Sequence, residues 1–315
     1  MLIVLSGSSG KSFFTYNIII LLPKDRKMIT ENMLINNFTG FFDSFKTMRI
    51  PDLFFKPNNK PYLKNQLLNA ISCDEFELVY QPQIEMSGQH VIGVEALLRW
   101  NSPEFGMIFP EYFIPAAEEF NLISELGNLV IDKACKQASL WKKQYTSDIR
   151  IAVNVSYMQV HNNQIVEFVD SCISKYAIEK SSLEIELTES SLIKDQAKVI
   201  RVLNEFKELG IRTAMDDFGT GYSSLSYLAS MPFDMIKIDR SFINLLGVNA
   251  ANTVITETII EMSKKLKMEV LAEGVETEKQ RNILLNSKCD LMQGNLISKP
   301  VSADKIPAVA GMNLC

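Results

Sequence analysis

The stretch TAMDDFGTGYSSLSYL, residues 213–228, joins a short apolar run to a turn with two glycines through the pair Asp216 and Asp217. The apolar run is typical of a buried strand that ends where the turn begins. Two like charges side by side at such a point are costly unless water or a cation surrounds them. The pair therefore indicates either ordinary loop carboxylates in water or a site that holds something cationic.

Outward from this stretch, short β-rich runs alternate with longer amphipathic patterns. The expected strands are 76–85, 90–100, 150–156, 182–190, 212–218, 234–239, 269–275 and 290–294. Helical spacing lies between most of them, as at 196–210, which ends on a glycine, and at 252–267. Eight strands, most of them separated by a helix, predict a TIM-like (β/α)8 barrel of the α/β class, a fold that needs ~250 residues.

The first two expected strands are joined only by MSGQ at 86–89. Parallel neighbours need a long crossover, whereas antiparallel neighbours can be joined by a tight turn. We therefore predict a modified barrel in which one strand runs antiparallel. The barrel is assigned to residues 67–315.

Residues 1–66 show no sustained period and are assigned to an N-terminal extension or truncated regulatory segment of unknown role. The stretch LSGSSGKS at 5–12 resembles a phosphate-binding loop, but that motif requires glycine where Leu5 stands. We expect a polar turn there instead.

Composition excludes several classes of protein. The chain has 315 residues, a net charge of −5 and only two histidines. The acidic balance argues against a DNA- or RNA-binding surface, and the shortage of histidine argues against imidazole-based zinc sites. No segment has the length of a membrane span or the pattern of a signal peptide, so a cytoplasmic location is expected.

Polar residues follow or end nearly every expected strand, where the apolar neighbours do not explain them. They are Glu95, Asn154, Glu186, Glu189, Asp216, Asp217, Lys237, Glu273 and Gln293. In a parallel barrel these ends converge on one face. Carboxylates gathered there need a cation, and oxygen ligands suit Mg²⁺ or Mn²⁺; adjacent aspartates favour a two-ion site for attack on phosphorus.

Each of these residues also has a local explanation. Arg99 is a possible partner for Glu95, and Asp239 for Lys237. Asn154 is equally suited to bonding the end of a strand. Only the recurrence of such residues at consecutive strand ends favours a shared site.

Seven motifs in order carry a resemblance to a known family. They are VEALLRW (94–100), NVS (154–156), ELTES (186–190), DDFGTGYSSLSYL (216–228), IKIDRSF (236–242), AEGVET (272–277) and QG (293–294). From about residue 67 to residue 300 the chain resembles the EAL-domain cyclic di-GMP phosphodiesterases. The resemblance implies hydrolysis of one phosphodiester bond of cyclic di-GMP to linear pGpG, which lowers the concentration of this second messenger.

The resemblance also implies roles for individual residues. Glu95, Asn154, Glu186 and Asp216 would bind one Mg²⁺ or Mn²⁺, with Asp216 bridging to a second ion that Asp217 helps to hold. The catalytic set would be Glu273 as general base or water-orienting group, Lys237 and Asp217. Gln81, Leu97, Arg99 and Gln293 would contact the substrate, with Arg99 on a phosphate.

A loop of regulatory importance in the family would comprise Gly219 and Gly221, braced by Glu189. The family commonly forms homodimers through the helix that corresponds to 223–231 here. One departure is Asn295, where the family usually has an aromatic residue, and we expect weaker base stacking. The intact ligand positions favour an enzyme over two alternatives: a non-catalytic cyclic di-GMP receptor or protein-interaction module on this fold, and an unrelated barrel enzyme acting on phosphorylated sugars.

Overall fold

The structure is a computed structural model that describes residues 2–10, 13–21, 32–34, 60–86, 90–145, 149–162, 164–192, 195–221, 228 and 230–312. The chain forms two compact units, Met1–Lys60 and Pro61–Cys315. The first described helix of the second unit, α3 (Lys60–Ser72), buries Leu63, Leu67 and Ala70. The division predicted between residues 66 and 67 falls inside this helix.

The first unit contains a three-stranded antiparallel sheet in the order β1 (Leu2–Gly10), β2 (Phe13–Leu21) and β3 (Asn32–Leu34). The expectation of a polar turn at 5–12 was wrong for Leu5–Gly10, which lie in β1 and pair with β2. Lys11 and Ser12 lie outside the described residues. The sequence FFTYNIIIL of β2 is rich in aromatic and β-branched residues that fit a pleated surface, although it shows no alternation of apolar and polar residues.

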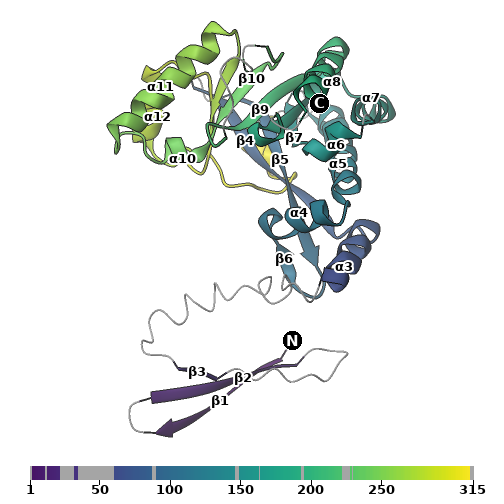
Figure 1. Cartoon of the computed structure of the whole chain (residues 1–315), viewed down its shortest axis with the longest axis vertical. Coiled ribbons are helices and arrows are strands. Elements are labelled where there is room, and N and C mark those ends of the chain that lie inside the picture. The colour runs from purple at the N-terminus through teal and green to yellow at the C-terminus, as the bar shows by residue number, and fades with distance from the viewer. Residues whose placement is uncertain are drawn as a thin grey trace. The chain divides into compact units, whose positions relative to one another are not determined.

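The second unit alternates strands and helices along the chain (Figure 1). Its described strands are β4 (Phe76–Glu85), β5 (Val91–Ser102), β6 (Gly106–Ile108), β7 (Arg150–Asn154), β8 (Leu183–Thr188), β9 (Arg212–Phe218), β10 (Met235–Ile238), β11 (Glu269–Ala272) and β12 (Leu291–Gln293). Its further described helices are α4 (Pro110–Glu119), α5 (Ile123–Gln144), α6 (Tyr157–His161), α7 (Ile165–Tyr176), α8 (Gln196–Leu209), α10 (Arg240–Ile243), α11 (Ala250–Lys265), α12 (Glu278–Asn286) and α13 (Ile306–Ala310).

Eight of these strands close into a barrel in the order β4-β12-β11-β10-β9-β8-β7-β5, and β4 pairs with β5 to complete it. Strands β5 and β7 to β12 run parallel, whereas β4 is antiparallel to both of its neighbours. The prediction of a modified barrel with one antiparallel strand is confirmed. The short connection between β4 and β5 explains it, since two adjacent strands without a crossover cannot run parallel.

Strand β5 continues well past the barrel. Its pairing with β7 ends at Ala96, while its pairing with β4 runs on to Trp100, and the added strand β6 pairs beyond that. Trp100, Phe76 and Phe113 of α4 pack with ring centroids 5.4–6.0 Å apart and support this extension. Glu95 therefore lies in the middle of β5, although it stands where the barrel part of the strand ends.

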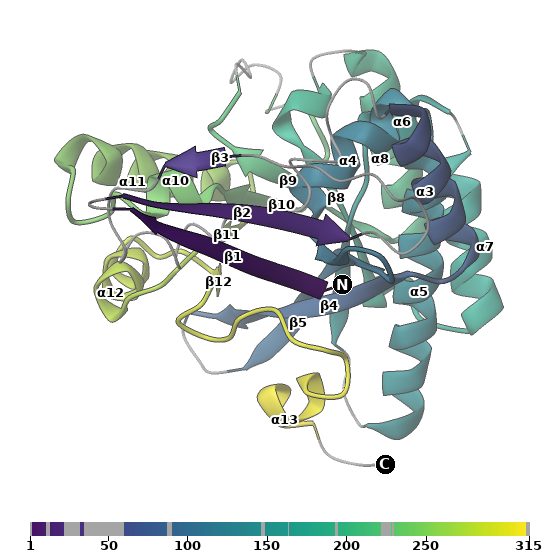
Figure 2. The same cartoon turned by 90° about the horizontal axis from the view of Figure 1, so that it is seen from below.

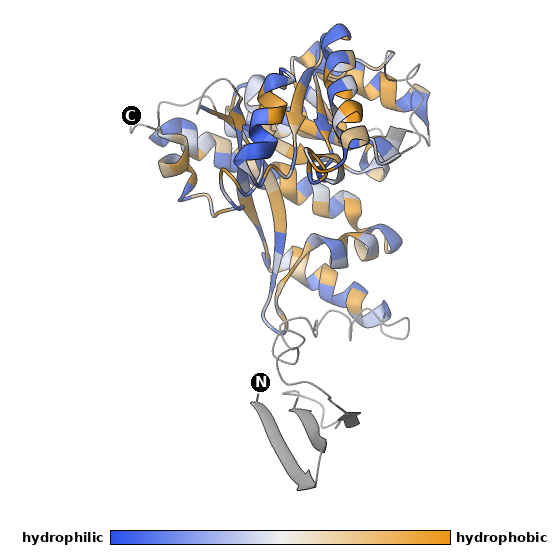
Figure 3. Cartoon of the chain, turned by 90° about the vertical axis from the view of Figure 1, so that its left-hand side faces the viewer, coloured by the Kyte–Doolittle hydropathy of each residue, from blue (hydrophilic) through white to orange (hydrophobic). Residues whose placement is uncertain are grey.

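The helices form an outer layer around the barrel. Helices α5, α7 and α8 lie along one side and α10, α11 and α12 along the other (Figures 1 and 2). Their outer faces are largely hydrophilic, whereas the strands are mainly hydrophobic (Figure 3). Helix α8 ends as expected, with Gly210 in the left-handed conformation at φ 77°. Among the described residues, no helix combines the length and apolar character that crossing a membrane requires.

Candidate metal centre

A fully buried lysine stands at the centre of the polar cluster at the carboxyl ends of the strands. Lys237 of β10 has no exposed surface, and its Nζ lies 2.8 Å from Glu186 Oε2, 2.8 Å from Glu273 Oε1 and 3.0 Å from Asp216 Oδ1. Glu95 Oε2 is 3.7 Å away. The four acidic residues come from β5, β8, β9 and the segment that follows β11. The predicted convergence of these residues is therefore present in the structure.

A local irregularity turns both adjacent aspartates toward this cluster. In the β9–β10 pairing, Ile236 faces Met215 but Ile238 faces Phe218, so Asp216 and Asp217 together stand opposite Lys237. Neighbouring residues of a regular strand point to opposite faces, and an extra residue changes that alternation. Asp217 adopts φ 55°, a left-handed conformation that aspartate tolerates better than most residues. Both carboxylates consequently line the same cavity.

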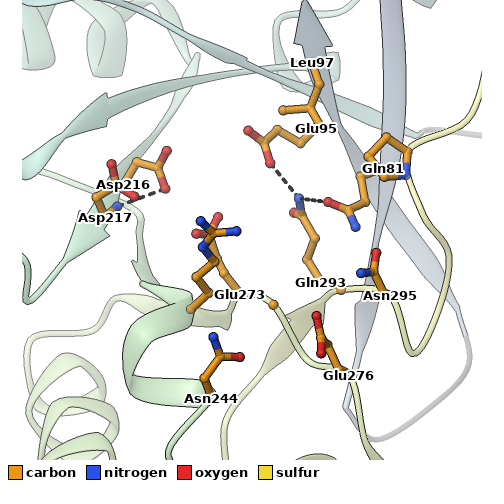
Figure 4. A pocket seen from close by; sticks show the side chains of 14 residues that line it. Gln81, Glu95, Leu97, Asp216, Asp217, Asn244, Glu273, Glu276, Gln293 and Asn295 are labelled. Carbon is orange, nitrogen blue, oxygen red and sulfur yellow. Dashed lines mark hydrogen bonds between the residues drawn. The ribbon is translucent and has the colours of Figure 1, made fainter. Parts of the chain in front are cut away.

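Amide side chains fix the opposite wall of the cluster. Asn154 Nδ2 donates to Glu95 Oε1 at 2.8 Å, and Gln293 Nε2 donates to Glu95 Oε2 at 2.6 Å. Gln293 Nε2 also reaches Gln81 Oε1 at 3.0 Å, and Gln83 Nε2 donates to Gln293 Oε1 at 3.1 Å (Figure 4). The sequence analysis missed Gln83, which is fully buried. The alternation of glutamine in YQPQIE was the available signal, because it places Gln81 and Gln83 on one face of β4.

Burial and mutual repulsion shift the pKa values of this cluster. Burial, with Asp216 adding to it and Lys237 opposing it, raises the pKa of Glu273 to about 8. Burial and the neighbouring Asp216 raise the pKa of Asp217 to about 6. Burial also raises the pKa of Glu186 well above its usual range. For Lys237, burial disfavours the charge, but the surrounding carboxylates outweigh it and raise the pKa.

The donor set fits a divalent cation. Two groups of carboxylates each have ligand atoms within 4.8 Å of one another, Glu95 with Glu186 and Asp216, and Asp216 with Asp217 and Glu273. Five carboxylates thus share one ammonium, and a buried excess of negative charge needs a further cation. The second oxygen of Glu186 is buried and accepts no hydrogen bond from the described residues. These acidic residues are therefore able to hold a metal ion.

A cavity of about 420 Å³ opens beside the cluster. Figure 4 shows Asp216 and Asp217 on one side of it, Glu95 and Gln81 across from them, and Glu273 between. Leu97 contributes an apolar patch to the wall. The cavity also has polar lining residues that the sequence analysis did not single out as binding groups, namely Arg240, Asn244 and Glu276, together with Asn295. A volume of this size suits a small-molecule ligand.

Glu189 braces the loop after β9. Its Oε2 accepts hydrogen bonds from the backbone N–H groups of Gly219 at 2.8 Å and Gly221 at 3.0 Å, and the side chain is 2% exposed. A Cβ at position 221 would lie 2.9 Å from the Glu189 carboxyl carbon, so glycine permits this close approach. The loop therefore follows any movement of Glu189. Positions 222–227 and 229 of the predicted dimer segment lie outside the described residues.

Arg99 is not among the residues that line the cavity. Its Nη1 donates to the Leu98 carbonyl at 2.8 Å, and its guanidinium carbon stands 5.5 Å from the centre of the Phe109 ring. Two of the local explanations also fail to describe the structure. Asp239 caps α10 through the Ser241 N–H, not Lys237, and Glu95 is held by Asn154 and Gln293.

Fold and cluster together define a modified α/β barrel with an acidic, metal-competent centre at the carboxyl ends of its strands. The sequence profile of the EAL domain matches residues 64–300. The chain therefore belongs to the EAL domain family.

Individual relatives share this region. The chain is 38% identical over 246 residues to the bifunctional diguanylate cyclase/cyclic di-GMP phosphodiesterase MucR of Pseudomonas aeruginosa, and 34% identical over 249 residues to the cyclic di-GMP phosphodiesterase NbdA of the same species. These matches cover 78% and 79% of this chain but 36% and 32% of the relatives. The chain thus spans about a third of the length of these curated relatives.

A solved structure, described as the PaMucR phosphodiesterase in complex with c-di-GMP, superimposes with a TM-score of 0.74 at 38% identity. The superposition covers 78% of this chain and 99% of that one. It therefore spans nearly all of the solved domain.

Proposed function

We propose that this protein is a cyclic di-GMP phosphodiesterase, which hydrolyses one phosphodiester bond of cyclic di-GMP to give linear pGpG. The observation that carries the proposal is the excess of buried carboxylates around Lys237, next to a cavity of small-molecule size. Membership of the EAL family and the names of its relatives support the choice of substrate.

Glu95, Asn154, Glu186 and Asp216 are the proposed ligands of one Mg²⁺ or Mn²⁺, and Asp216 and Asp217 of a second. Asn154 uses its amide N–H to bond Glu95, which leaves its carbonyl oxygen as the ligand atom. When bound, divalent ions of this kind neutralise phosphoryl oxygens and make an adjacent water easier to deprotonate. Oxygen-only ligands suit hard cations such as Mg²⁺ and Mn²⁺.

Glu273 is the proposed general base. Its raised pKa suits a group that takes a proton near neutral pH, and Lys237 Nζ at 2.8 Å fixes the orientation of its carboxylate. The oxygen of the attacking water bonds to phosphorus, the bond from phosphorus to the 3′ oxygen breaks, and that oxygen leaves with a proton. Lys237 holds Glu186 and Asp216 in place during this step, and Gln293 holds Glu95.

A non-catalytic receptor or protein-interaction module on the same fold is the alternative. The proposed ligands are all present and face one another, which favours the enzyme. We further propose a cytoplasmic location and a homodimer formed through the segment around residues 223–231. Leu228 and Met231 of this segment are buried, so an interface would use its other residues.

The decisive experiment incubates the purified protein with cyclic di-GMP and Mg²⁺, Mn²⁺ or excess chelator, and separates the products by chromatography. Asp216→Asn runs alongside. Conversion to pGpG that requires metal and fails in the variant supports the proposal. Tight binding without conversion would make the protein a receptor, and neither binding nor conversion would refute the proposed function.

A further inference from the structure

The cavity has a second polar wall, opposite in chemistry to the metal centre. Arg240 and Asn244 lie on α10 and its C-cap, Glu276 lies just before α12, and Asn295 follows β12. We call these four residues the polar wall. All four line the cavity and are largely exposed to it. Figure 4 shows Asn244, Glu276 and Asn295 gathered on the side away from Asp216 and Asp217.

The polar wall is rigidly built. The Val275 N–H donates to the Gln293 carbonyl at 3.0 Å, and the Leu296 N–H donates to the Val275 carbonyl at 3.0 Å. A Cβ at Gly294 would lie 2.2 Å from the Val275 oxygen, so only glycine lets these two segments approach so closely. Glu276 and Asn295, which follow Val275 and Gly294, are thereby held on adjoining segments.

The helical part of the wall is fixed to the same segments. A Cβ at Gly274, which has φ 67°, would lie 2.6 Å from Arg240 Cβ, so α10 packs directly against the residue after Glu273. Gln280 Nε2 of α12 donates to the Ile243 carbonyl of α10 at 3.1 Å. Asn244 lies one turn beyond Arg240, which places the two side chains on the same face of α10.

The side chains of the polar wall have no partners of their own. Within the described part of the chain, no hydrogen bond or ion pair engages the side chains of Arg240, Asn244, Glu276 or Asn295. Polar side chains that a rigid frame presents to a cavity without partners are available to a ligand. No aromatic ring lines this cavity, so a purine bound here is recognised at its edge and is not stacked.

The chemistry of the four residues matches a guanine nucleotide. A carboxylate accepts from the N1–H and N2–H groups of guanine, while adenine presents an acceptor at N1 that a carboxylate repels. An amide side chain pairs with the O6 and N7 acceptors, and a guanidinium suits a phosphate. Arg240 presents such a group to the cavity, whereas Arg99 does not line it.

We propose that the polar wall determines the base specificity of the site, with Glu276, Asn244 and Asn295 binding the edge of one guanine and Arg240 binding the adjoining phosphate. The proposal rests on the proposed function, since it names how that substrate is recognised. It also gives Asn295 a polar role in place of the aromatic residue usual in the family.

The test measures kcat and KM for cyclic di-GMP and for cyclic di-AMP in Arg240→Ala, Asn244→Ala, Glu276→Gln and Asn295→Ala. Controls are Arg201→Ala and Glu257→Gln, which change the same charges at exposed positions outside the cavity. We expect KM for cyclic di-GMP to rise about tenfold in Glu276→Gln and Arg240→Ala and about threefold in the asparagine variants, with a smaller change in kcat. Glu276→Gln should also narrow the preference for guanine.

A rise in KM confined to the wall variants, with an altered ratio between the two dinucleotides for Glu276→Gln, supports the proposal. KM values equal to those of the controls would overturn it while leaving the phosphodiesterase assignment intact. If the wild-type protein binds without turnover, calorimetric Kd values for the same variants replace KM. If the wild-type protein neither binds nor cleaves cyclic di-GMP, the proposed function fails and this inference fails with it.

Discussion

Two buried glutamates stand two residues apart on β8, and their surroundings differ in charge. Glu184, near the amino end of the strand, faces Arg150 and Arg212, each with Nε 3.2 Å from its Oε2. Glu186, near the carboxyl end, shares the single cation Lys237 with other acids. Both side chains are fully buried, and one oxygen of each accepts no hydrogen bond from the described residues.

The difference therefore lies in the balance of charge around each glutamate. At the amino ends, two arginines meet Glu184 and Glu269, so the cluster is close to neutral. At the carboxyl ends, five carboxylates meet one lysine. An apolar layer of Ala214, Met235, Leu271 and Leu291 belongs to the barrel interior near both. The neutral cluster is complete by itself, whereas the acidic cluster requires a cation from solution.

The largest expected effect is the loss of activity in Asp216→Asn. Removing one carboxylate from both proposed ion sites should lower kcat at least about 1,000-fold, which corresponds to about 4 kcal/mol. The hydrolysis assay with Mg²⁺ or Mn²⁺ measures it. The far-UV circular dichroism of the variant should match that of the wild type, because the variant relieves repulsion between like charges. More than a tenth of wild-type activity would contradict the assigned site.

The matched pair Glu184→Gln and Glu186→Gln tests the comparison directly. In chelator, Glu184→Gln should lower the free energy of unfolding by about 3 kcal/mol, because it leaves buried arginine without its counter-charge. Glu186→Gln should change it little or increase it, since Lys237 keeps Asp216 and Glu273 as partners. Urea titrations report both values. Equal losses in the two variants would show that the acidic cluster is as self-sufficient as the neutral one.

Metal addition should separate the same two clusters more gently. A divalent ion at about 100 times its Kd stabilises the folded state by about 2.7 kcal/mol, which raises the unfolding temperature by about 5 °C or more. Mg²⁺ or Mn²⁺ should produce this shift in the wild type and in Glu184→Gln but not in Asp216→Asn. A monovalent salt at matched ionic strength is the control, and a shift retained in Asp216→Asn would place the ion elsewhere.

The smallest expected effect concerns the loop after β9. Glu189→Gln replaces a charged acceptor of two backbone N–H groups with a neutral one and should weaken the bracing by about 1 kcal/mol. Hydrogen exchange at Gly219 and Gly221 should accelerate about fivefold, with a modest loss of activity. Unchanged exchange at both glycines would show that the loop is held by other contacts.

Much of the barrel was predictable because its pattern is local. The expected strands at 76–85 and 212–218 coincide with β4 and β9, and the glycine at 210 ends α8 as predicted. The antiparallel strand followed from the length of one connection. The strands of residues 2–34 and the short β6 were missed, because neither carries the period-two alternation on which the prediction relied.

The sequence by itself determined which residues were available at the strand ends, since the order of strands and the kind of side chain are written in it. Only the tertiary structure decided which of these groups meet. Lys237 reaches acids from three strands and from the segment after β11 instead of its neighbour Asp239, and a bulge turns Asp217 to the side of Asp216. Such pairings depend on register and chain closure between segments far apart in the sequence, which no local pattern records.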